Sequence, residues 1–161
     1  MNIELRALQL TIDADSQLPR FAAQIWIDGE QAFAADNHAS DGAIRLRATG
    51  ALDQALVDAR IACSHPAICT DGHRIAASLE LEVARLVDHA AIMQEIRSRL
   101  RHSLLVIESG RVIAYPVQGE ERGQLASAVL KRSPNATFLD PSDEDGINRA
   151  AALILGDDVL G

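Results

Sequence analysis

The pair Asp28-Gly29 constrains the fold of this chain more than any other feature. Runs typical of strands flank it, at residues 21–27 and residues 31–35. Asp-Gly suits a two-residue type I′ turn, because both central residues of that turn need a positive φ. The pair therefore predicts a β-hairpin near the N-terminus. Residues 3–12 add a strand, and the change of apolar parity along them predicts a bulge or a change of buried face.

The composition supports a packed core built from aliphatic side chains. Hydrophobic residues make up 48% of the 161 residues, a share that a disordered chain rarely reaches, but aromatic residues make up only 3%. The length fits one domain, so we expect a single domain over residues 1–161.

The middle of the chain is expected to be mostly loop and helix. Residues 36–50 have the composition of a loop, and residues 64–72 look irregular. The first predicted helix spans about residues 51–62, capped by Thr49 or Gly50. Its inward stripe is predicted to hold Leu52, Ala55, Leu56 and Ala59.

A long helix is predicted over about residues 79–101. Residues 75–83 also alternate as a strand would, but the polar residues that follow fit only a helix.

The C-terminal part is predicted to form a hairpin followed by a helix, a strand and a helix. Ser109-Gly110 is typical of a tight turn between two strands. Ser142 and Asp145 have the spacing of a capping box for the last helix. The predicted fold class is α+β: an N-terminal antiparallel β-meander, a long central helix, and a C-terminal β-hairpin plus α-β-α. The remaining elements are expected at residues 103–108, 111–117, 120–132, 136–139 and 147–155.

The net charge of −8 bears on the class of partner. Direct binding of nucleic acid needs a basic surface, so the charge argues against it. An acidic face can instead dock on a basic protein groove, including one that holds DNA or RNA.

No run of residues is apolar enough to span a bilayer, and the first residues lack the features of a signal peptide. Two cysteines are too few for a disulfide scaffold, so a cytoplasmic protein is expected.

The polar segment that follows the hairpin supplies one candidate site. Asp36, Asn37, His38 and Asp41 cluster there, and Arg45 completes the predicted binding residues. His38 has a side chain suited to proton transfer near neutral pH, with Asp36 or Asp41 to orient it. The alternative is a solvated loop in which Asn and Asp bond their own backbone.

A second candidate site is a possible zinc site. Cys63, His65, Cys69 and His73 would offer two thiolates and two imidazoles, the donors of a tetrahedral zinc site. Five residues separate the two cysteines, whereas structural zinc loops usually place two to four between them. The alternatives are a thiolate nucleophile with a histidine base, a disulfide, or Cys63 as a core residue on the apolar face of its helix. Zinc is thus the one cofactor considered, and no catalytic residue is predicted.

The run FAAQIWIDGEQAF, residues 21–33, resembles small uncharacterised proteins of bacterial genomes, plasmids and phages. The likeness continues in the long helix, in the strand at residues 104–107 and at residues 136–140. The loop here keeps Asn37, His38 and Gly42 but lacks the other glycines of those proteins. The resemblance implies an accessory protein of a mobile element, a class that includes antagonists of host defence.

Two functional hypotheses follow. The first is a non-enzymatic, acidic protein-interaction module whose partner has a basic surface, such as an anti-CRISPR-like inhibitor of a host nucleic-acid-binding complex. The second is a small hydrolase or metal-dependent enzyme that uses His38 with Asp36 and Asp41, or a zinc site at Cys63–His73. A homodimer with a structural role is a third possibility.

Overall fold

The computed structural model describes residues 1–11, 19–37, 42–65, 67–70, 73–117 and 122–156. It has an α+β fold with the N-terminal meander, the long central helix and the C-terminal hairpin plus α-β-α that the sequence predicts. The chain packs as two compact units, which we call unit 1 (Met1–Asp88) and unit 2 (His89–Gly161). The expectation of one domain over residues 1–161 stays a prediction.

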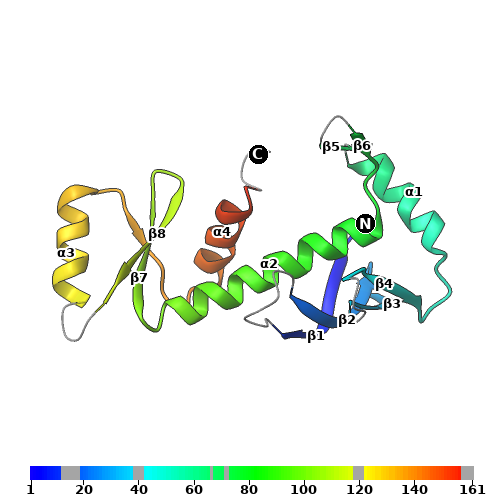
Figure 1. Ribbon diagram of the computed structural model, residues 1–161, viewed down its shortest axis with the longest axis horizontal. Helices are drawn as coiled ribbons and strands as arrows, with labels where there is room; N and C mark the ends of the chain where they lie inside the picture. Colours follow the sequence, from blue (N-terminus) through cyan, green and yellow to red (C-terminus); the bar gives the residue numbers. More distant parts are fainter. Residues whose placement is uncertain (12–18, 38–41, 66, 71–72, 118–121, 157–161) are drawn as a thin grey trace. The chain divides into compact units, whose positions relative to one another are not determined.

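Unit 1 is built on a four-stranded antiparallel sheet in the order β1-β2-β3-β4 (Figure 1). Its strands are β1 (Ile3–Thr11), β2 (Arg20–Ile27), β3 (Glu30–Asp36) and β4 (Arg45–Ala48). The fourth strand corrects the prediction of a loop over residues 36–50. It is a short edge strand that alternates arginine with small or apolar residues, so its apolar signal is weak, yet Leu46 still packs on the core.

The two backbone irregularities expected in this sheet are present. Asp28 and Gly29 have φ values of 51° and 90°, as a type I′ turn requires. The register of β1 against β2 shifts between Arg6 and Gln9, and Ala7 lies there at φ 50°. This bulge explains why the apolar parity changes along the strand.

Helix α1 (Gln54–Ser64) starts later than predicted and buries a different face. Asp53 is the N-cap, and its carboxylate accepts a hydrogen bond from the Ala55 N–H at 2.7 Å. Thr49 and Gly50 do not cap the helix, because it begins only after Asp53; their N–H groups both donate to the Ala32 carbonyl beside the sheet.

The predicted inward stripe of α1 is wrong as well. Val57 and Ile61 are buried, whereas Leu56 is 67% exposed. A small hairpin follows α1 where irregular chain was expected, formed by β5 (Ile68–Thr70) and β6 (His73–Ile75).

Helix α2 (Leu79–Arg99) confirms the predicted long helix. Asp58 of α1 accepts a hydrogen bond from the Leu79 N–H at 2.7 Å, which satisfies a free donor at the start of α2. The first half of α2 contributes Leu79, Val83 and Val87 to the core of unit 1, which also holds the side chains of β2 and β3. The second half contributes to the core of unit 2. None of the described helices is both long and apolar enough to cross a bilayer.

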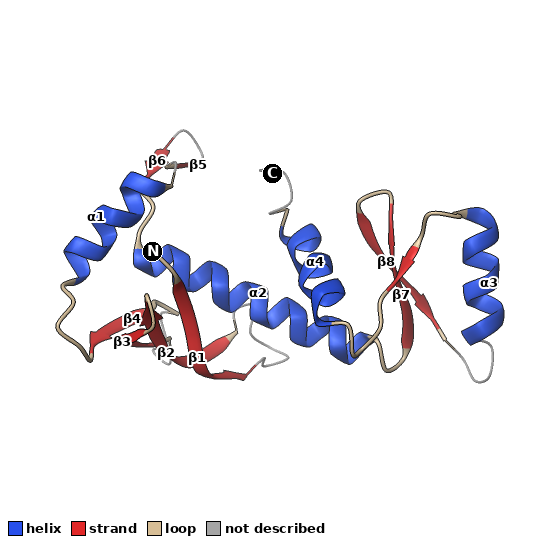
Figure 2. Cartoon of the chain, turned by 180° about the vertical axis from the view of Figure 1, so that it is seen from behind, coloured by secondary structure: helices blue, strands red, loops and turns tan. Residues whose placement is uncertain are grey.

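Unit 2 contains a three-stranded sheet in the order β8-β7-β9. Its elements are β7 (Ser103–Glu108), β8 (Arg111–Pro116), α3 (Arg122–Arg132), β9 (Thr137–Phe138) and α4 (Glu144–Leu155). Figure 2 shows the β7–β8 hairpin together with the helices α3 and α4. Ser109 and Gly110 form the predicted tight turn at φ 51° and 73°.

The predicted capping box of α4 is wrong by one residue. Asp143, not Ser142, is the N-cap, and its carboxylate accepts from the Gly146 N–H at 3.0 Å. The Ser142 N–H instead donates to the Asp140 carboxylate at 2.8 Å, because Asp140 starts its own local turn before the helix.

Candidate functional site

Unit 1 carries a groove of about 260 Å³ in which one wall is the first half of α2. The opposite wall comes from the chain before β2, the end of β3 and the chain before β4. We call it the acidic groove, and it is lined by Pro19, Phe21, Asn37, Gly42, Ala43, Ile44, Glu80, Ala84, Val87 and Asp88.

Asn37 builds the wall of the acidic groove that faces α2. Its side chain is 8% exposed, its Oδ1 accepts from the Phe21 N–H at 2.7 Å, and its Nδ2 donates to the Pro19 carbonyl at 2.8 Å. The side chain therefore ties the end of β3 to the start of β2. The structure places this predicted binding residue at a groove, but with its amide already engaged by the backbone.

Glu80, Ala84 and Asp88 form one stripe of α2 along the acidic groove. Residues four apart lie one above the other on a helix, so the two carboxylates are separated by about 12 Å along the axis. Ala84, the small residue between them, leaves the space that the groove occupies. Val87 and Ile44 add apolar surface to the lining.

The two carboxylates of the acidic groove differ from most others in the described part of the chain. Glu82, on the same helix, forms an ion pair with Arg85 at 2.8 Å, and most described carboxylates likewise have a hydrogen-bond or ion-pair partner. Within the described residues, Glu80 and Asp88 have none. Partial burial by the surrounding protein raises the pKa of Asp88 above its usual value.

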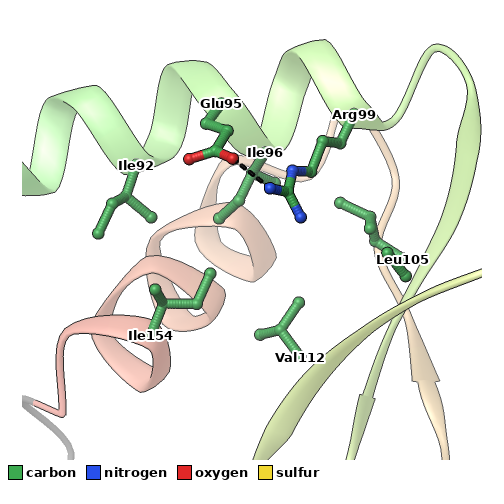
Figure 3. A pocket seen from close by; sticks show the side chains of 8 residues that line it. Ile92, Glu95, Ile96, Arg99, Leu105, Val112 and Ile154 are labelled. Atoms are coloured by element: carbon green, nitrogen blue, oxygen red, sulfur yellow. Dashed lines mark ion pairs between the residues drawn. The ribbon is translucent and has the colours of Figure 1, made fainter. Parts of the chain in front are cut away.

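Unit 2 carries a groove of about 250 Å³ between α2, α4 and the β7–β8 hairpin (Figure 3). Its lining is mostly aliphatic, and Ile154 on the α4 side is 50% exposed. Glu95 and Arg99, at the edge of this groove, form an ion pair with each other across one turn of α2. The charged groups of this groove are thus already matched, unlike those of the acidic groove.

The predicted loop site is only partly within the described residues. The Asp36 carboxylate accepts from the Arg47 guanidinium at 2.9 Å, and Arg45 lies opposite Asp36 in the β3–β4 register. The Asp36 carboxylate is therefore already engaged by a cation of the neighbouring strand. His38 and Asp41 lie outside the described residues, so their acid–base role stays a prediction.

The predicted zinc residues lie at the end of α1 and in the hairpin that follows. Cys63 and His65 are exposed, so the alternative of Cys63 as a buried core residue is wrong. Cys69 lies in β5 opposite Arg74, and His73 lies in β6 opposite Thr70, but their side chains are outside the description. The described side chains of His, Cys, Asp and Glu form no group of three or more that could hold a metal ion. Zinc binding stays a prediction.

Glu80 and Asp88 are the residues that the sequence analysis missed. Their signal was available, since acidic residues spaced by eight around Ala84 run beside the apolar stripe of Leu79, Val83 and Val87.

Comparison of the chain with protein families, with curated proteins and with solved structures finds no match.

Proposed function

We propose that this chain is a non-enzymatic protein-interaction module that binds a basic segment of a partner protein in the acidic groove. One observation carries the proposal: Glu80 and Asp88 stand without ion-pair partners, within the described residues, on the wall of a groove with apolar lining. No lysine or arginine is among the described residues that line it. A cationic side chain with an aliphatic stem complements both properties, because the stem covers apolar surface while the charge meets a carboxylate.

The size of the acidic groove favours a side chain over a free metabolite as its occupant. Pockets for small molecules usually measure about 300–1,000 Å³. The acidic groove, at about 260 Å³, is smaller than that range. This size suits one or two long side chains of a protein partner.

The distribution of charge supports the same class of partner. Unit 1 holds thirteen acidic and seven basic residues, so most of the net charge of −8 belongs to the unit that carries the groove. Such a field attracts basic surfaces and speeds their association. Proteins that bind nucleic acid offer such surfaces, so an anti-CRISPR-like inhibitor of a host nucleic-acid-binding complex in the bacterial cytoplasm is the concrete form of the proposal.

Affinity capture with matched variants tests the proposed function. Wild-type protein, E80Q, D88N and the control E30Q are used to capture partners from a bacterial lysate at low and high salt. Glu30 is the control because it is acidic, lies in unit 1 outside the groove lining, and has no ion-pair partner within the described residues. We expect a basic partner that E30Q retains, that the two groove variants lose, and that added salt releases.

Two results would count against the proposed function. One is capture that the groove variants do not weaken, and the other is capture that is insensitive to salt. If this protein inhibits a nucleic-acid-binding complex, nucleic acid should also compete with it for the captured partner. Light scattering of the purified protein separately tests the third hypothesis, a homodimer with a structural role.

A further inference from the structure

The two carboxylates of the acidic groove are too far apart to bind one cation together. They are eight residues apart on α2, which corresponds to about 12 Å along the helix. An ion pair requires that the charged atoms approach within about 4 Å. Each carboxylate therefore needs a cation of its own, and Ala84 keeps the space between them open.

We propose that the acidic groove selects an extended segment in which two cationic residues are separated by three others. An extended chain advances about 3.3 Å per residue, so residues i and i+4 are about 13 Å apart and project from the same face. This spacing matches that of Glu80 and Asp88. The inference rests on the proposed function and adds the pattern that the partner segment must carry.

The extended form follows from the number of residues that each backbone needs to reach both carboxylates. An extended segment spans the two carboxylates with five residues, whereas a helix needs nine residues and is about 10–12 Å wide. A groove of about 260 Å³ receives the side chains of such a segment and not its backbone, so we propose the form that brings both cations to it with the fewest ordered residues. In the extended segment, residue i+2 faces the groove between the two cations. It meets Ala84 and Ile44, so a small apolar residue fits there.

Two peptides of identical composition test the spacing. The first, Gly-Arg-Ser-Ala-Ser-Arg-Gly, places its arginines at i and i+4, and the second, Gly-Arg-Ser-Arg-Ser-Ala-Gly, places them at i and i+2. Both keep the two arginines and the alanine on one face. Binding of fluorescently labelled peptides to the full chain is measured by anisotropy at low salt. We expect the first peptide to bind about threefold more tightly, the factor that one additional exposed ion pair provides.

The variants E80Q and D88N test whether the preference for the i, i+4 peptide arises at the acidic groove. E80Q and D88N should each reduce the ratio of the two affinities to about one, because each leaves a single carboxylate for the second cation. The control E30Q should keep the threefold ratio. All three positions are exposed, and thermal unfolding of each variant verifies that it is folded.

The possible failures are distinguishable. If the wild type binds both peptides equally but prefers them over a peptide with serine in place of arginine, the spacing proposal is overturned and the proposed function survives. If it prefers neither peptide over the serine peptide, the proposed function fails as well. If E80Q and D88N keep the ratio, the cations bind elsewhere and the assignment to the acidic groove is wrong.

Discussion

At the scale of single residues, Asn37 shows how a polar side chain at a groove can serve the fold. It is buried, and both ends of its amide bond backbone atoms of the segment that begins β2. Truncation by Asn37→Ala leaves the buried Phe21 N–H without this partner, and such a loss costs about 1–3 kcal/mol. We expect that drop in the free energy of unfolding, measured with urea. Asn135→Ala, at an exposed position, is the matched control and should change the free energy by less than about 0.5 kcal/mol.

Asp88 offers a prediction about pH. Partial burial raises the pKa of its carboxyl in the folded protein, so the folded state binds the proton more tightly than the unfolded state. The contribution of Asp88 to stability is therefore fully present below its unfolded pKa and is lost as pH rises through its raised folded pKa.

Asp88→Asn should remove this pH dependence. The difference in unfolding free energy between the variant and the wild type should shift in favour of the variant from about pH 3.5 to pH 6.5, because other groups titrate alike in both proteins. Urea unfolding at the two pH values measures it. A difference that stays constant, or shifts in favour of the wild type, would contradict the inferred desolvation.

At the scale of elements, the sequence pattern of α1 predicts that a helix forms, but packing decides which face of that helix is buried. Leu56 and Ile61 are both large aliphatic residues of α1, but Leu56 is 67% exposed and Ile61 is 2% exposed. Ile61→Ala should cost about 2–5 kcal/mol, as for other buried aliphatic truncations. Leu56→Ala should change the unfolding free energy by less than about 0.5 kcal/mol. Equal costs in urea unfolding would mean that the buried face of α1 has been assigned wrongly.

The tight turns, helix α1 and strand β4 together show why part of the fold could be predicted and part could not. The turns at Asp28-Gly29 and Ser109-Gly110 have local signals, since the backbone there needs positive φ and few residue pairs supply it. The inward face of α1 has no such signal, because two overlapping apolar stripes are available and only the neighbouring sheet selects one. Strand β4 was missed for a similar reason: its pairing with β3, not its own sequence, makes it a strand.

At the scale of the whole molecule, the candidate site was harder to predict than the fold. The acidic groove combines residues from positions 19 to 88, and its two carboxylates matter because they lack partners within the described part of the chain. Sequence shows which residues are acidic but not which of them are paired. The sequence analysis chose the polar loop at Asp36–Asp41 because its polar residues lie close together in the sequence, and the structure shows Asp36 bonded to Arg47.

The excess of negative charge predicts opposite effects of salt on the stability of the fold and on the binding of a basic peptide. A net charge of −8 favours expansion of the chain through self-repulsion, and salt screens that repulsion. The melting temperature should therefore rise between about 20 and 200 mM NaCl, where the Debye length falls from roughly 20 to 7 Å. Binding of the i, i+4 arginine peptide should weaken over the same range, because that attraction is screened too. Calorimetry and anisotropy on one protein sample measure both trends. If salt changed the two quantities in the same direction, unmatched negative charge would not be the property that connects the fold of this protein to its partner.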